Sequence, residues 1–245
     1  MAEQKVVFSV DGKTLRGDFQ LPRPGAACVF LCHGMEGSKD GAKWQLLAAR
    51  LAEAGLGSLR FNFRGCGDGD DKSEGSFEDT SLTGRVADLK AGMDAAVGLG
   101  ASPESLGVIG SSMGGMVAIA ANDERIKAQV LLATPVSLAD LEARLPADGD
   151  RLTMPSGQTI LRAGLQDAAD YDLPALVAGQ KVATLILHGD ADELVSLDHP
   201  LTLYKAAKEP RQMEIIPGGG HSLDGEEHLG HVVELGVSWL AEHLS

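Results

Sequence analysis

Residues 106–115 run Leu106-Gly107-Val108-Ile109-Gly110-Ser111-Ser112-Met113-Gly114-Gly115. An apolar run of strand length leads into two serines, and the apolar residues 116–121 that follow are typical of a helix. Glycines lie two positions before and two positions after Ser112, where the missing side chains allow a tight turn. The stretch therefore predicts a buried strand, a sharp turn that holds the Ser112 hydroxyl outward, and a helix.

This stretch matches the G-x-S-x-G pattern of a nucleophile turn, centred on Ser112. Ser111 is not the candidate, because centring the pattern on it would put Ile109 and Met113 at the glycine positions. A serine hydroxyl needs a base to take its proton, and the base needs a carboxylate to orient it. The pattern therefore requires an acidic residue and a histidine further along the chain.

Candidates for both partners lie downstream, in the order acid and then histidine that this pattern requires. His221 follows the strand-like residues 212–216 and a turn of one proline and three glycines, which is not typical of a core histidine. Asp190 and Asp192 both follow the strand-like residues 182–187. We expect His221 to act as general base and an aspartate of this pair, Asp192, to orient it.

A tetrahedral intermediate also needs hydrogen-bond donors for its oxyanion, and these are typically two backbone amides. The loop after residues 28–32 contains Met35, and Met113 directly follows the candidate nucleophile. We predict that the amides of Met35 and Met113 form the oxyanion hole. His33, in the same loop as Met35, is interpreted as bracing that loop, and His188 is interpreted as structural.

The rest of the chain alternates strand-like and helix-like patterns. Residues 6–10 and 14–20 alternate around an Asp-Gly pair, which predicts an antiparallel hairpin. Strands that alternate with helices then predict a mostly parallel sheet with helices on both faces. The strand-like runs are residues 28–32, 57–63, 106–110, 129–133, 182–187 and 212–216, and the helical patterns are residues 44–53, 82–97 and 228–243.

Residues 135–180 do not follow this alternation. They mix prolines and glycines with scattered apolar residues and contain no convincing buried strand. We interpret them as a lid-like insertion over the site, within a single domain that spans residues 1–245. The apolar residues expected to form a pocket wall for short, medium or aromatic acyl groups are Met154, Leu161, Leu165, Tyr171 and Leu173.

Composition excludes several classes of partner. The 245 residues carry a formal net charge of −14, whereas phosphate binding needs clustered Lys and Arg, so we expect no nucleic-acid partner. No apolar stretch approaches the roughly 18 residues of a membrane span, and the first ten residues lack the core of a signal peptide. We expect a cytoplasmic protein without a membrane partner, and the sequence leaves open whether it is a monomer or a homodimer.

Neither a disulfide framework nor a metal site is expected. The cysteines Cys28, Cys32 and Cys66 are odd in number, and the first two lie in a strand-like run as small buried residues. His228 and His231 are three residues apart beside several glutamates, which is the spacing of a possible metal site. A solvated helix face is the favoured interpretation of this pair.

Together these motifs resemble the α/β-hydrolase superfamily across nearly the whole chain. Within it, the chain is similar to small bacterial carboxylesterases related to cinnamoyl and feruloyl esterases, and more distantly to dienelactone hydrolases and serine peptidases. The motifs that carry the resemblance are His33-Gly34, the R-G-x-G turn at residues 64–67, the turn at Ser112, the H-G-x-x-D-x-x-V pattern at residues 188–195, and Gly220-His221.

The resemblance implies an α/β-hydrolase fold with a mostly parallel sheet of about eight strands, hydrolysis through an acyl-enzyme, and no cofactor. It favours Asp192 over Asp190, because Asp192 fills the acid position of its pattern. Cys66 departs from the family, in which relatives commonly carry histidine at this place in the R-G-x-G turn.

The expected function is that of a serine hydrolase, a carboxylesterase that cleaves small acyl or aryl esters. A serine peptidase or amidase and a thioesterase are the alternative enzymes, because the same triad serves all three reactions. Outside enzymes, the alternative is a non-catalytic binding module that kept the fold. Such a module has usually lost a triad member, whereas Ser112, Asp192 and His221 are all present.

Overall fold

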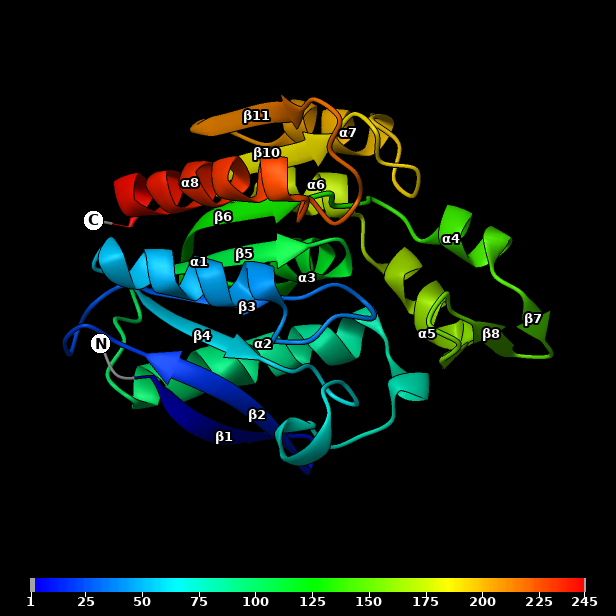
Figure 1. The fold of residues 1–245 in the computed structure, drawn as a ribbon, viewed down its shortest axis with the longest axis horizontal. Helices are drawn as coiled ribbons and strands as arrows, with labels where there is room; N and C mark the ends of the chain where they lie inside the picture. The colour runs from blue at the N-terminus through cyan, green and yellow to red at the C-terminus, as the bar shows by residue number, and fades with distance from the viewer. Residues whose placement is uncertain (1–2, 245) are drawn as a thin grey trace.

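The computed structural model describes residues 3–244, and an eight-stranded sheet forms its centre (Figure 1). The strands of this sheet are β1 (Gln4–Val10), β2 (Lys13–Gln20), β3 (Cys28–Cys32), β4 (Gly57–Phe61), β5 (Leu106–Ser111), β6 (Ile126–Leu132), β10 (Ala183–Gly189) and β11 (Arg211–Ile216). Their order across the sheet is β1-β2-β4-β3-β5-β6-β10-β11.

The sheet is parallel from β4 to β11 and antiparallel at its first edge. The predicted hairpin is present, because β1 pairs antiparallel with β2, which in turn pairs antiparallel with β4. All the other pairings are parallel, as expected for strands joined through helices. The prediction of a mostly parallel sheet of about eight strands in an α/β-hydrolase fold is confirmed.

Helices cover both faces of the sheet. The helices that pack on it are α1 (Ala42–Glu53), α2 (Leu82–Gly98), α3 (Met113–Ala121), α6 (Leu173–Gly179), α7 (Asp198–Ala206) and α8 (Glu226–His243). α1 and α8 bury their apolar side chains against one face and lie in front of the sheet in Figure 1, whereas α2, α3, α6 and α7 pack against the other.

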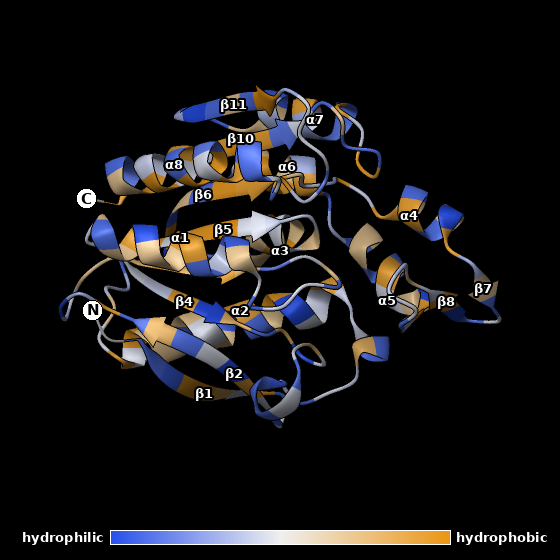
Figure 2. Cartoon of the chain, viewed as in Figure 1, coloured by the Kyte–Doolittle hydropathy of each residue, from blue (hydrophilic) through white to orange (hydrophobic). Residues whose placement is uncertain are grey.

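Successive side chains of β3 point to opposite faces of the sheet, so this strand packs against the helices on both faces. Phe30 and Cys32 pack in the layer under α2 and α3, whereas Val29 and Leu31 pack in the layer under α1 and α8. All five residues of β3 are buried, as expected for a central strand covered on both faces. In Figure 2 the central strand β6 is mainly orange, whereas β11, at the edge, carries both colours.

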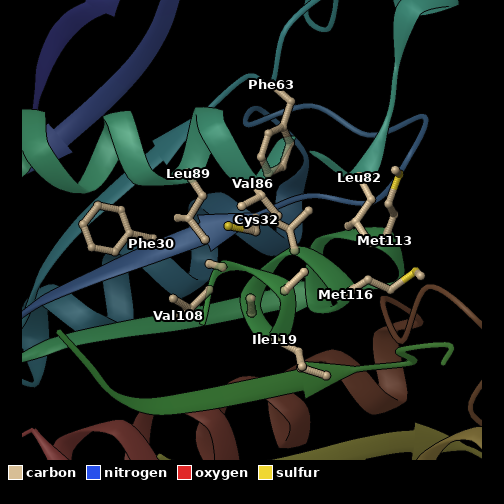
Figure 3. Packing of buried hydrophobic residues seen from close by; sticks show 14 of the residues in the cluster. Phe30, Cys32, Phe63, Leu82, Val86, Leu89, Val108, Met113, Met116 and Ile119 are labelled. Atoms are coloured by element: carbon tan, nitrogen blue, oxygen red, sulfur yellow. The ribbon is translucent and has the colours of Figure 1, made fainter. Parts of the chain in front are cut away.

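The layer beneath α2 supports the turn after β5. Figure 3 shows Leu82, Val86 and Leu89 of α2 pointing toward Val108 of β5 and Met116 of α3, and all five side chains are buried. Ser81 caps the start of α2 by accepting a hydrogen bond from the amide of the third helical residue. The start of α3 is therefore held between a buried strand and a capped helix.

The insertion contains more regular structure than the sequence indicates. Its elements are α4 (Ala139–Arg144), β7 (Ala147–Asp148), β8 (Arg151–Thr153), β9 (Thr159–Leu161), α5 (Arg162–Gln166), a 3-10 turn (Asp167–Asp170) and α6. The three short strands form a separate antiparallel sheet, which the sequence did not predict. Leu152 and Ile160 are buried between exposed or half-buried neighbours, so β8 and β9 each bury a single residue, while β7 buries none. Such short strands give no recognisable pattern in the sequence.

No helix within residues 3–244 is both long enough and apolar enough to cross a membrane. The cysteines are buried with free thiols, and burial raises the pKa of all three.

Candidate active site

Ser112 occupies the turn between β5 and α3 in a strained conformation. Its backbone has φ 54° and ψ −122°, a region that residues other than glycine rarely adopt and that is typical of functional turns. A Cβ on Gly110 would lie 2.3 Å from the carbonyl oxygen of Gly114, and one on Gly114 would lie 2.1 Å from that of Cys32. Both glycines are therefore required by close backbone contacts that hold Ser112 in place.

The structure brings Ser112, Asp192 and His221 together from three separate loops. These loops follow β5, β10 and β11, whose ends lie at the same edge of the sheet (Figure 1). His221 Nε2 lies 3.0 Å from Ser112 Oγ, and His221 Nδ1 lies 2.9 Å from Asp192 Oδ2. The three side chains form one continuous hydrogen-bonded chain from hydroxyl to imidazole to carboxylate.

Asp192 is held so that one oxygen faces His221. Its Oδ1 accepts hydrogen bonds from the amides of Leu194 and Val195, both at 2.9 Å, and its side chain is only 1 % exposed. Burial is the largest influence and raises its pKa, but the hydrogen bonds from His221, Val195 and Leu194 together lower that pKa below the usual value. An ionised Asp192 places the proton of His221 on Nδ1, so Nε2 is free to accept the proton of Ser112.

The loops that carry the acid and the histidine are locked together. Asp190 Oδ1 accepts a hydrogen bond from the amide of Gly218 at 2.6 Å, and the amide of Ala191 donates to the carbonyl of Gly219 at 3.0 Å. A Cβ on Gly189 would lie 1.9 Å from that same carbonyl oxygen. The structure thus places Asp190 in the contact between the loops and Asp192 against the histidine.

His188 lies behind the candidate triad. Its Nε2 lies 2.8 Å from the carbonyl oxygen of Val195, which can only accept, so Nε2 carries a proton. Burial lowers the pKa of His188, and its Nδ1 has no hydrogen-bond partner among the described residues. The hydrogen bond from His188 braces the loop that carries Asp192, which is a structural role.

The two predicted oxyanion-hole amides lie on either side of Ser112. Met113 is the first residue of α3, where amides have no acceptor within the helix. On the other side, a Cβ built on Gly34 would lie only 3.5 Å from the Cβ of Ser112, so the loop with Met35 packs directly against Ser112. Within residues 3–244 neither the Met35 nor the Met113 amide donates to another group.

A cavity of about 790 Å³ opens over this site, and Ser112, His221 and Met35 line it. Its apolar side chains come from the loop after β3, from α1, from the insertion, from the loop after β10 and from α8. The apolar residues that line it are Met35, Ala42, Trp44, Pro135, Leu138, Leu141, Leu145, Pro146, Met154, Pro155, Leu194, Val195 and Leu229. This size and composition suit a small organic substrate.

Four of the five residues that were predicted from the sequence to form the cavity wall do not line the cavity. Met154 lines the cavity as predicted, but Leu161, Leu165, Tyr171 and Leu173 do not. Leu165 and Leu173 are buried in the core layer beneath the insertion, and the Tyr171 hydroxyl bonds to a threonine of α2. The part of the wall that the insertion supplies comes instead from α4, the segments beside it and the turn between β8 and β9.

Lys43, in the first turn of α1, is a site residue that the sequence did not indicate. Its Nζ donates to the carbonyl of Ser222 at 2.5 Å and lies 3.3 Å from Ser111 Oγ, so it joins the neighbours of His221 and Ser112. Lys43 also lines the cavity. Burial lowers the pKa of Lys43 to about 8. The negative charge of nearby Asp224 acts in the opposite direction and raises that pKa.

The histidine of the α8 pair that has a described side-chain partner is His231. His231 Nε2 lies 2.8 Å from Glu214 Oε1 on β11, which forms a surface contact between helix and strand. Within residues 3–244, no group of three or more histidine, cysteine, aspartate or glutamate side chains is arranged to hold a metal ion.

The fold and the geometry of the site together identify the class of protein to which this chain belongs. The strand order, the parallel crossovers and the strained serine turn at the carboxyl edge are those of an α/β hydrolase. Residues 42–245 match the prolyl oligopeptidase family, and the chain belongs to that family. The chain is thus a hydrolase.

Other proteins share the sequence or the fold of this chain. The uncharacterized protein YfhR of Salmonella typhimurium is 28% identical over 240 residues, which cover 90% of this chain and 74% of YfhR. The structure of Est1E from Butyrivibrio proteoclasticus with ferulic acid bound is 26% identical, with a TM-score of 0.85 over 97% of this chain and 98% of Est1E. An esterase domain from a Rhodothermus marinus protein, at 22% identity and a TM-score of 0.79 over the whole of both chains, shares the fold.

Proposed function

We propose that this protein is a serine carboxylesterase that cleaves small acyl or aryl esters through an acyl-enzyme. The observation that carries the proposal is the hydrogen-bonded chain from Ser112 through His221 to Asp192, which opens into the cavity of about 790 Å³. Ser112 is the nucleophile, His221 the general base, and Asp192 the group that orients His221.

Acylation follows from this geometry. Ser112 Oγ attacks the ester carbonyl carbon while its proton passes to His221 Nε2, and the carbonyl oxygen becomes an oxyanion. The amides of Met35 and Met113 donate hydrogen bonds to that oxyanion. When the tetrahedral intermediate collapses, the bond to the alcohol oxygen breaks and His221 returns the proton to the departing alcohol.

Deacylation repeats the sequence with water. His221 takes a proton from a water molecule, whose oxygen attacks the acyl carbon. Collapse of the second tetrahedral intermediate releases the carboxylic acid, and Ser112 Oγ regains its proton from His221. Asp192 stays ionised and stabilises the imidazolium in both halves of the reaction.

The cavity supports small esters as the substrates. The apolar side chains of its wall favour an uncharged acyl or aryl group. The same cavity is also lined by the charged side chains of Glu36, Lys43, Asp140, Arg144 and Asp224. The similarity to Est1E, whose structure holds ferulic acid, agrees with an aromatic acid as one acceptable acyl group.

Amide hydrolysis is the second candidate, and one observation favours it. The family that matches residues 42–245 carries the name of a peptidase, prolyl oligopeptidase. The same triad can attack an amide, although the leaving amine must be protonated. Matched p-nitrophenyl ester, thioester and p-nitroanilide substrates with one acyl group would separate the three activities, and we expect the ester to give the highest kcat/KM.

Covalent labelling tests the proposal directly. A fluorophosphonate should label the wild-type protein on Ser112, and peptide mass spectrometry should locate the adduct there. Ser112→Ala should abolish both labelling and ester hydrolysis. The matched control is Ser111→Ala, which removes a neighbouring hydroxyl that contacts Lys43 and should keep a substantial fraction of activity.

Two results would contradict the proposal. An adduct on Ser111 would move the nucleophile by one residue. A folded wild-type protein that neither reacts with the phosphonate nor cleaves any of the esters would favour the non-catalytic binding module.

A further inference from the structure

Arg85 of α2 is fully buried, and the mechanism above does not use it. Its Nη1 donates to the carbonyl of Gly34 at 3.0 Å, and its Nη2 donates to the carbonyl of Met35 at 2.7 Å. The same Nη2 lies 3.4 Å from Cys66 Sγ, and the guanidinium lies 4.8 Å from the centre of the Phe63 ring. One arginine therefore holds two successive peptide groups of the loop beside Ser112.

The burial of this cation calls for a reason other than packing. Among residues 3–244, Arg85 forms no ion pair within 4.0 Å, and its Nε has no hydrogen-bond partner. Burial lowers the pKa of Arg85, yet a guanidinium keeps its charge in proteins. An apolar side chain of similar volume would fill this space without the desolvation of a charge. The carbonyl groups of the loop are the partners that offset this desolvation.

The Gly34 carbonyl receives a second donor from His33. His33 Nε2 accepts a hydrogen bond from the amide of Phe63 at 3.3 Å, so its proton lies on Nδ1, which is 2.7 Å from the Gly34 oxygen. Burial, together with the nearby Arg85 charge, lowers the pKa of His33 to about 3, so this ring stays neutral. Two donors from different elements therefore converge on one carbonyl.

That carbonyl belongs to the same peptide group as the Met35 amide. A trans peptide is planar, so the N–H of Met35 points opposite to the Gly34 carbonyl. Donors that hold the carbonyl from behind fix the plane of the peptide and thereby the direction of the N–H. They also draw electron density toward the oxygen, which makes the N–H a stronger donor.

We infer that Arg85 is a positioning residue of the oxyanion hole: it clamps the Gly34–Met35 peptide so that the Met35 amide faces the reacting carbonyl at Ser112. This inference rests on the proposed function, in which the Met35 amide stabilises the oxyanion. Arg85 touches neither substrate nor triad, and acts through the backbone of the loop.

The test compares Arg85→Met with wild type in three measurements. These are kcat and KM for p-nitrophenyl acetate, the melting temperature, and the pKa of the hemiketal that Ser112 forms with an aryl trifluoromethyl ketone. In that adduct Ser112 Oγ bonds to the ketone carbon and the ketone oxygen occupies the oxyanion hole. Carbon-13 NMR of the labelled ketone carbon follows its ionisation.

We expect Arg85→Met to lower kcat by about 10- to 100-fold, less than or comparable to the loss of a whole oxyanion-hole donor. KM should stay within about twofold, because ground-state binding does not use the clamp. The hemiketal pKa should rise by about one to two units, which is the same tenfold to hundredfold change expressed as acidity. Arg85→Lys, which keeps a cation but not the two-pronged fork, should lie between wild type and Arg85→Met.

Arg64→Met is the matched control. Arg64 is a mostly buried arginine that pairs with Asp88 at 2.6 Å and forms no contact with the Gly34–Met35 peptide. Its loss should lower the melting temperature and leave the hemiketal pKa unchanged. If Arg85→Met does not fold, Arg85→Lys carries the same comparison.

The outcomes separate the two proposals. If wild type neither cleaves the ester nor forms the hemiketal, the proposed function fails and the clamp fails with it. If wild type reacts and the Arg85 variants lose only melting temperature, with the hemiketal pKa of wild type, the clamp alone is overturned. A raised hemiketal pKa in the Arg85 variants and not in Arg64→Met supports it.

Discussion

Replacement of Asp192 by asparagine tests the candidate triad at its third member. Asp192 Oδ1 accepts hydrogen bonds from the amides of Leu194 and Val195, so in Asp192→Asn the amide oxygen must stay at that position. The new NH₂ group then occupies the Oδ2 position, 2.9 Å from His221 Nδ1. Because two donors cannot face each other, His221 must move its proton from Nδ1 to Nε2.

This tautomer disables the base, since Nε2 then points a proton at Ser112 Oγ across the 3.0 Å contact. The negative charge that stabilises the imidazolium is lost as well. The equivalent substitution in serine proteases lowers kcat by about ten-thousandfold, and we expect a loss of that order here. The two backbone hydrogen bonds to Oδ1 survive, so the variant should fold and melt within a few degrees of wild type.

Asp190→Asn is the control from the same loop. Asp190 Oδ1 accepts from the amide of Gly218, a bond that an asparagine oxygen can keep, and the side chain does not contact His221. This variant should retain most of its kcat, and any effect should appear in the melting temperature. Initial rates on p-nitrophenyl acetate and thermal melts of both variants decide the matter. An inactive Asp190→Asn beside a near-wild-type Asp192→Asn would refute the assignment.

Three further expectations concern other parts of the site. Gly114→Ala should lower kcat and reduce the unfolding free energy, measured by chemical denaturation, by about 1–3 kcal/mol or more. The reason is that the new Cβ would lie 2.1 Å from the Cys32 carbonyl oxygen. A variant with unchanged kcat and stability would show that the turn can relax. Lys43 has its pKa lowered to about 8 by burial, so the folded state disfavours its protonated form, and this penalty is full below pH 8 and fades as pH rises toward 10.5. The unfolding free energy of wild type relative to Lys43→Met should therefore rise above pH 8, by up to about 1.4 kcal/mol per pH unit, and parallel curves would contradict the burial of this charge. Activity on p-nitrophenyl esters should peak at short, medium or aromatic acyl groups, and a steady rise toward palmitate would rule out the cavity described above as the acyl site.

The central strands and the turn at Ser112 could be predicted because each leaves a recognisable pattern in the sequence. β3 and β5 are buried on both faces and therefore read as unbroken apolar runs. Gly110 is required by its contact with Gly114, and Gly114 by its contact with Cys32 of β3, and both requirements appear in the sequence as glycines on either side of Ser112. Asp192 and His221 each follow directly after a strand, so the parallel sheet alone brings their loops to one edge.

Other features depend on contacts between distant segments, and no sequence pattern marks them. Lys43 meets Ser222 across 179 positions, and Arg85 meets Gly34 across 51, while both residues resemble ordinary helix surface positions in the sequence. The cavity wall was misassigned for a related reason. Apolar residues of the insertion divide between the cavity and the core layer according to how its short strands fold back, as Leu165 shows by packing in the core.

The contacts between the loops after β10 and β11 have a consequence for how substrate range can change over evolutionary time. Gly189, Ala191 and Gly219 hold the loops of Asp192 and His221 together through close contacts of their own backbones at the end of the main sheet. Much of the cavity wall, by contrast, belongs to α4 and the turn between β8 and β9. Mutational drift in those segments can therefore reshape the substrates that fit while the reacting groups keep their alignment, which makes the insertion the natural target for laboratory evolution of specificity.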